Sequence, residues 1–169
     1  MNASVERLDG GVSVKWLLKL KKGIPLLVAF PDIGLVGLLT ATNAINSNRM
    51  PLTAFFESPW IPSAISVVNG KPLSPVRLYS DENLAILLSE VPLSVELWNP
   101  FSDLVSILWE RFSPKVILGA VGLPNQKRHT MEKDKLRVFV SYTKDEVKNE
   151  YFESYPDFSG MVVGPYAAM

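Results

Sequence analysis

The sequence predicts an α/β fold: a layered α/β/α domain with a mainly parallel central sheet and an inserted β-hairpin. The first observation behind this prediction is the stretch from Ile24 to Asn48, where a short apolar run leads through a glycine-bearing turn into residues with helical spacing. A buried strand followed by a glycine turn and a helix is the opening unit of layered α/β domains. The second observation is that further apolar runs of strand length share the chain with an amphipathic helical pattern after Asn99.

Each predicted strand follows from a short apolar run between turn residues. Strands are predicted at residues 12–20, 24–30, 51–57, 73–79, 84–89, 115–121, 136–142 and 160–164. The first is expected at a sheet edge, because its lysines discourage further pairing. The strand at 51–57 is expected to run parallel to the strand at 24–30. Asn69-Gly70 is a strong hairpin signal and predicts the inserted hairpin.

Helices are predicted at residues 33–48 and 100–113, with short ones starting at 143 and 164. The second has apolar residues at i, i+3, i+4, i+7 and i+8, with Asn99 as its cap, Pro100 as its first residue and Pro114 after its end. A capping box from Thr143 to Glu146 opens the third. With no repeat and no linker, residues 1–169 are expected to form a single domain.

Composition excludes several classes of protein. The 169 residues include 17 basic and 17 acidic ones, so no net charge favours nucleic acid as a partner. A hydrophobic content of 47% with 20% charged residues argues against disorder and favours an oligomer. The chain has no cysteine, no signal-peptide pattern and no uninterrupted apolar run long enough for a bilayer. We therefore expect a cytoplasmic protein without a membrane partner.

The predicted helix at residues 33–48 is apolar on nearly every side. Its small residues form one stripe, made of Gly34, Gly37, Ala41 and Ala44. Its bulky residues form a second stripe, which includes Leu35, Leu38, Leu39 and Ile45. A helix that is hydrophobic all round must be covered on two sides. We expect the sheet to cover the small residues, and we predict that the bulky ones contact a second subunit or a further part of the fold.

Trp60 is a second candidate contact residue. It lies between Pro59 and Pro62, so its loop is stiff and would lose little entropy on binding a partner. Tryptophan is also commonly buried, and a Trp60 that folds back onto the core is an equal alternative.

A ligand crevice is a further hypothesis. Asp32, Gly34 and Gly37 resemble a dinucleotide-binding turn, and Glu57 stands at about the distance expected of a ribose-binding carboxylate. Glu90 also follows a predicted strand, so these carboxylates could share one edge of the sheet and serve a phosphorylase-like reaction. The preferred interpretation is that Asp32 caps the helix and the glycines permit close packing, because a negative charge would repel a pyrophosphate there.

No metal or cofactor is expected. His129 is the only histidine, it lies in a charged loop, and the chain has no cysteine to complete a metal site. No Gly-x-Ser-x-Gly elbow is present, which disfavours a serine hydrolase.

Several segments, in this order, are similar to a known family. They are Pro-Asp-Ile-Gly-Leu-Val-Gly after the first buried strand, Ser58-Pro-Trp-Ile-Pro62, Asn69-Gly-Lys-Pro72, Pro75-Val-Arg-Leu-Tyr79, Ser89-Glu-Val-Pro92 and Ile117-Leu-Gly-Ala-Val-Gly-Leu-Pro124. Together they resemble the proteasome assembly chaperone 2 family in its archaeal form, over roughly residues 25–165. The resemblance implies an α/β fold related to nucleoside phosphorylases.

The same resemblance implies a function. It suggests a non-enzymatic assembly chaperone that forms homo-oligomers and binds proteasome α subunits or assembly intermediates. Members of the family usually continue past the Gly-Pro turn, so this chain is expected to lack the last helices of the family fold. Some dock through a C-terminal hydrophobic-Tyr-any tail; here Tyr166 is not penultimate. The alternative function is a nucleoside- or nucleotide-binding protein, or a phosphorylase-like enzyme that uses the strand-end carboxylates.

Overall fold

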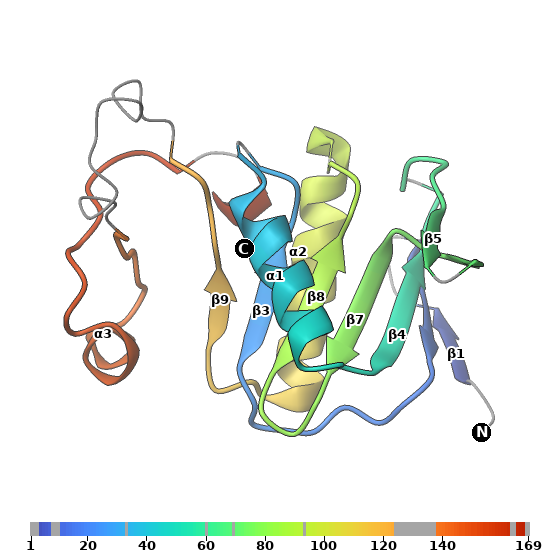
Figure 1. The fold of residues 1–169 in the computed structure, drawn as a ribbon, viewed down its shortest axis with the longest axis horizontal. Helices are drawn as coiled ribbons and strands as arrows, with labels where there is room; N and C mark the ends of the chain where they lie inside the picture. The colour runs from blue at the N-terminus through green and yellow to red at the C-terminus, as the bar shows by residue number, and fades with distance from the viewer. Residues whose placement is uncertain are drawn as a thin grey trace. The chain divides into compact units, whose positions relative to one another are not determined.

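The computed structural model describes residues 4–7, 11–32, 34–59, 61–68, 70–92, 94–123, 138–162 and 165–167 (Figure 1). The chain divides into two compact units, Met1–Leu123 with Gly164–Met169, and Pro124–Val163. That residues 1–169 form a single domain stays a prediction.

The first unit is built on a mixed sheet. Its strands are β1 (Ser4–Arg7), β2 (Ser13–Trp16), β3 (Leu26–Ala29), β4 (Leu52–Glu57), β7 (Val76–Ser80), β8 (Ala85–Ser89) and β9 (Ile117–Gly119). They lie in the order β1-β2-β4-β7-β8-β3-β9. Only β3 pairs in parallel, with β8 on one side and β9 on the other, while the four pairings from β1 to β8 are antiparallel.

The α/β fold is therefore as predicted, but the mainly parallel sheet needs correction. β4 does run in the same direction as β3, yet the antiparallel hairpin of β7 and β8 lies between them. Strands joined by a short turn pair antiparallel without a crossover helix, as β7 and β8 do, and the connection from β4 to β7 contains the β5–β6 hairpin in place of a helix. β2 is not an edge strand either, because residues 4–7 form β1 outside it.

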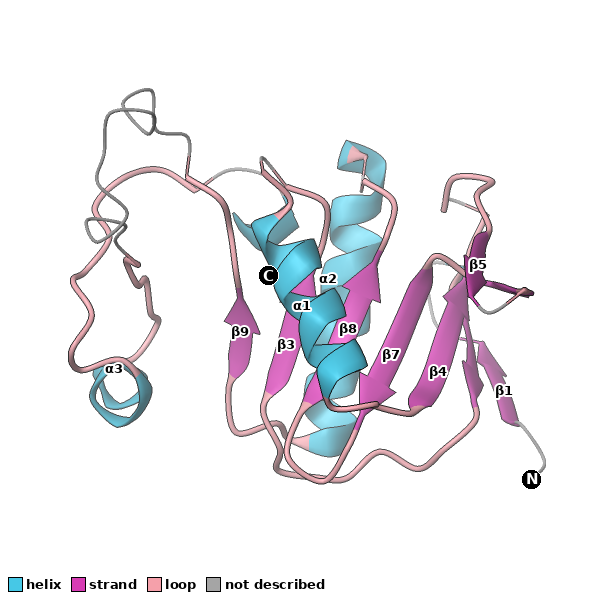
Figure 2. Cartoon of the chain, in the orientation of Figure 1, coloured by secondary structure: helices cyan, strands magenta, loops and turns pink. Residues whose placement is uncertain are grey.

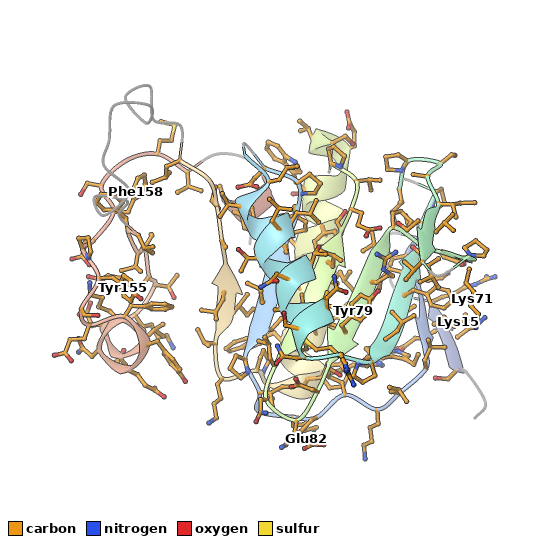
Figure 3. The ribbon with its side chains drawn as sticks, viewed as in Figure 1. Lys15, Lys71, Tyr79, Glu82, Tyr155 and Phe158 are labelled. Carbon is orange, nitrogen blue, oxygen red and sulfur yellow. The ribbon has the colours of Figure 1, made fainter. Side chains whose placement is uncertain are left out.

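Two helices cover opposite faces of the sheet and complete three layers (Figure 2). Helix α1 (Val36–Ser47) packs its Ala41 and Ile45 against Ile86 and Leu88 of β8. Helix α2 (Val95–Phe112) packs on the other face, where its apolar residues meet the inward residues of five strands. The alternation along β8, with Leu87 on one face and Leu88 on the other, is that of a strand buried on both sides. Tyr79 in Figure 3 lies on the face that α1 covers.

Both long helices begin elsewhere than predicted. α1 starts at Val36 instead of residue 33, after Leu35 in the left-handed conformation with φ 56°. α2 starts at Val95 after an extended Ser94, so Asn99 lies within the helix. Trp98 packs against the core and continues the apolar helical spacing of the residues that follow it. This tertiary contact outweighs the local preference for a helix that begins at Pro100.

The predicted hairpin is present as a separate two-stranded sheet of β5 (Ser66–Val68) and β6 (Lys71–Leu73). In the second unit, helix α3 (Asp145–Tyr151) follows Lys144, and Thr143 makes no side-chain cap. Where a strand was predicted at 136–142, the described part shows only a bridge from Val140 to Asp157. The final predicted helix is a single 3₁₀ turn, η4 (Pro165–Ala167), in the first unit.

Candidate functional site at the carboxyl edge of the sheet

The polar residues predicted to share a crevice do lie at one edge of the sheet, but they are dispersed along it. β3 leads to α1 on one face and the adjacent β8 leads to α2 on the other, which is the switch point where open α/β sheets bind ligands. Asp32 follows β3 and Glu90 follows β8. Glu57 ends β4, two strands from β8 and three from β3, or about 10 and 14 Å at ordinary strand spacing.

Asp32 joins two loops and leaves the helix uncapped. One of its carboxylate oxygens accepts a hydrogen bond from the backbone N–H of Gly122, and its backbone carbonyl accepts one from Leu35. Its other carboxylate oxygen is buried with no hydrogen-bond partner among the described residues. The preferred interpretation of Asp32 as the cap is therefore wrong, because Leu35 holds the N-cap position and no side chain caps α1.

Tyr166 fills the space between these loops. Its hydroxyl accepts a hydrogen bond of 3.1 Å from the backbone N–H of Phe30, and its ring centroid lies 5.0 Å from that of Phe30. Burial raises the pKa of Tyr166, and the nearby negative charge of Asp32 raises it further, while the hydrogen bond from Phe30 acts in the opposite direction. The phenol is therefore held in its neutral form.

Two glycines make room for this ring. A Cβ on Gly37 would lie 2.4 Å from the carbonyl oxygen of Ala120 and 2.7 Å from the hydroxyl of Tyr166. A Cβ on Gly119 would lie 2.8 Å from the same ring. The glycines at both positions therefore serve close packing, and we call the assembly of Asp32, Gly37, Gly119 and Tyr166 the glycine–tyrosine junction.

Glu90 belongs to a different cluster. It pairs with Arg77 at 2.6 Å, and its other oxygen accepts a hydrogen bond from the hydroxyl of Ser66 on the β5–β6 hairpin. The Arg77 side chain is 2% exposed and also donates to the carbonyl of Ser74, while its Nε has no partner among the described residues. The pair thus ties the hairpin to the sheet.

This arrangement does not assemble a carboxylate site for chemistry. Asp32 bonds Gly122 and Glu90 bonds Arg77, so each carboxylate already has an internal partner. Glu57 is too distant to act with the turn at Gly34 as a dinucleotide site, since such sites need the neighbouring parallel strand. In the described part of the chain no group of three His, Asp or Glu residues could hold a metal ion, and His129 lies outside that part.

The predicted contact residues of α1 divide between core and surface. Ile45 is buried against the sheet, and Leu38 is half-buried beside it. The prediction that Ile45, as one of the bulky stripe, contacts a second subunit or a further part of the fold is therefore corrected. Leu35 is 43% exposed, Val36 is 41% exposed and Leu39 is 60% exposed. We call these three exposed residues the α1 edge. Trp60 lies outside the described residues.

Comparison with known proteins decides the family. The model of the PAC2 family matches residues 26–169. This chain belongs to the PAC2 family. The uncharacterized protein MJ0106 of Methanocaldococcus jannaschii is 26% identical over 100 residues, which are 59% of this chain and 42% of that protein. The chain thus spans less than half of that relative's length.

Solved structures agree on the PAC2 fold. Pyrococcus furiosus PbaA, an archaeal homolog of proteasome-assembly chaperone, matches 90% of this chain and 66% of its own with a TM-score of 0.74 and 21% identity. Pyrococcus furiosus PbaB, an archaeal proteasome activator, matches 94% of this chain and 72% of its own with a TM-score of 0.71 and 16% identity. A Thermoplasma acidophilum protein of unknown function has a TM-score of 0.68 and 18% identity, over 85% of this chain and 58% of its own.

Sequence reasoning about this PAC2 protein overlooked Arg77 and Tyr166 as organising residues. Arg77 alternates with core residues in β7, and a charged residue inside an otherwise apolar strand was the available signal. Tyr166 offered no such signal, because its partners Phe30 and Gly37 are about 130 residues away.

None of the described helices has both the length and the hydropathy that crossing a bilayer requires.

Proposed function

We propose that this PAC2 protein is a non-enzymatic assembly chaperone of the cytoplasm that works as a homo-oligomer and binds proteasome α subunits or their assembly intermediates. Family membership supports this role, together with the fold shared with PbaA and PbaB. A chaperone of this kind needs a surface that recognises other chains, and it needs no reactive centre.

The observation that carries the proposal is the α1 edge. Leu35, Val36 and Leu39 are exposed, and no residue from Val36 to Ser47 is charged. Surface helices ordinarily carry charged residues on their outer face. An uncharged apolar edge is typical of a protein–protein contact, and it can meet its own copy without like-charge repulsion.

Co-purification tests the subunit contact. Tagged protein should retain purified proteasome α subunits on a column, and Leu39→Ser should reduce retention at least fivefold. Val95→Ser is the matched control, because Val95 is 67% exposed on α2 and its loss should leave retention unchanged. Equal retention by both variants, or no retention by the unchanged protein, would refute the proposal.

Light scattering with size-exclusion chromatography tests self-association separately. The unchanged protein should be larger than a monomer at micromolar concentration, and Leu39→Ser should shift it toward the monomer. A well-behaved monomer at that concentration would remove self-association from the proposal and leave the subunit contact to the column experiment.

A further inference from the structure

Two hollows open side by side where β4 ends, within the unit that holds the sheet. The first has a volume of about 330 Å³ and apolar walls that include Ile61, Ile65 and Leu73. The second has a volume of about 460 Å³ and lies toward Arg7. Glu57 lines both hollows, so they form one two-lobed depression, which we call the Glu57 groove.

The charge at the centre of this groove is unbalanced. The carboxylates of Asp32 and Glu90 on the same sheet edge are bonded internally, but the carboxylate of the exposed Glu57 has no hydrogen bond or ion pair with any described residue. Arg7 is also without an ion pair in the described chain. In the sheet, Arg7 of β1 and Glu57 of β4 each pair with Ser13 of β2, one on either side of it. About two strand spacings, or roughly 10 Å, therefore separate Arg7 from Glu57.

The walls are stiff. Prolines 59, 62, 72 and 75 line the two hollows, and a proline ring fixes φ. The hairpin that forms one wall is anchored through Ser66 to Glu90 and the buried Arg77. A preformed wall loses little conformational entropy when it binds. Ile65 in this wall is 71% exposed, and Val67, two residues further along, is 70% exposed and adds to the apolar surface.

We propose that the Glu57 groove docks an extended segment of a partner protein, whose Lys or Arg pairs with Glu57 while an adjacent apolar side chain fills the smaller hollow and an acidic one faces Arg7. Charge complementarity selects this occupant: along the groove an apolar lobe, the anionic Glu57 and the cationic Arg7 follow one another, so they require an apolar, a basic and an acidic side chain in that order. Small-molecule sites bury most of their ligand, whereas this groove is open along its length. The groove is separate from the α1 edge, so the proposal does not depend on the proposed function.

Selection from a phage-displayed library of random linear dodecapeptides tests the proposal. Unchanged protein should enrich peptides with Lys or Arg beside a large apolar residue. Glu57→Lys should instead enrich peptides with Asp or Glu at that place. A selected peptide, labelled with fluorescein and followed by anisotropy, should bind Glu57→Lys at least tenfold more weakly, and Arg7→Glu about threefold more weakly.

Two controls separate docking from loss of structure. Glu110→Lys makes the same charge change at an exposed position of α2, and it should leave peptide affinity within twofold. Leu39→Ser should also retain the peptide. Failure to enrich any peptide, the same consensus from unchanged protein and Glu57→Lys, or a change of oligomeric mass caused by Glu57→Lys alone would each overturn the proposal, the last by assigning the groove to a second copy.

Discussion

The glycine–tyrosine junction and the Glu57 groove lie at the same edge of the sheet and differ in how they are filled. At the junction, Gly37 and Gly119 are in close contact with other parts of the chain, and Asp32 is bonded to Gly122. At the groove, the Glu57 carboxylate and the Arg7 guanidinium have no side-chain partner among the described residues and lie beside exposed apolar residues. Glycines at the junction therefore indicate packing, while the unpaired charges at the groove indicate recognition.

The largest expected effect is that of Gly37→Ala. The new Cβ would meet the backbone oxygen of Ala120, which cannot move without shifting β9 and its loop, so we expect a loss of about 3 kcal/mol in the free energy of unfolding. Urea denaturation measures it. Gly119→Ala should cost less, because its clash is with the Tyr166 ring, and Tyr166→Ala in the same chain should remove most of that cost.

If Gly37→Ala proves neutral, the junction is not tightly packed and the contrast with the groove fails. Ser47→Ala, an exposed position of the same helix, serves as the control and should change stability by less than about 0.5 kcal/mol.

Glu90→Gln has the next largest expected effect. It leaves the guanidinium of Arg77 buried without a countercharge, and because Glu90 is one-third exposed we expect about 2 kcal/mol of destabilisation instead of the full cost of a buried pair. Amide hydrogen exchange in β5 should also quicken, since Ser66 loses its charged acceptor. Glu82→Gln breaks the exposed pair with Lys21 and should cost under about 0.5 kcal/mol. Equal costs for the two variants would show that burial of Arg77 is unimportant.

Tyr166→Phe has the smallest expected effect and depends on pH. Loss of the acceptor for the Phe30 N–H should cost about 1 kcal/mol at neutral pH. Because burial raises the pKa of Tyr166 in the folded state, its neutral form stabilises the protein fully below the ordinary tyrosine pKa near 10, and this contribution is lost as the pH rises further. The stability difference between the unchanged protein and Tyr166→Phe should therefore shrink as the pH rises above about 10. A difference that stays constant over this range would mean that Tyr166 titrates normally.

What the sequence could predict was local. The apolar run before Asp32, the hairpin signal at Asn69-Gly70 and the spacing from Phe101 to Phe112 each belong to one element, and these three elements are present. Strand order was beyond reach, because short turns permit β7 and β8 to pair antiparallel and to separate β3 from β4. At the candidate site, the sequence placed the carboxylates on the right edge but not their partners, since the choice between Gly122 and a helix cap for Asp32 depends on tertiary contacts.

The contact between Tyr166 and Phe30 joins residues 136 positions apart. Chains are made from the N-terminus, and early segments fold while later ones are still being added. β3, α1 and the sheet can therefore form with the space beside Gly37 and Gly119 still open. The space closes only after synthesis has passed residue 166. Until then a nascent chain exposes the core at Phe30, and the Tyr166 ring covers it once that residue has been made.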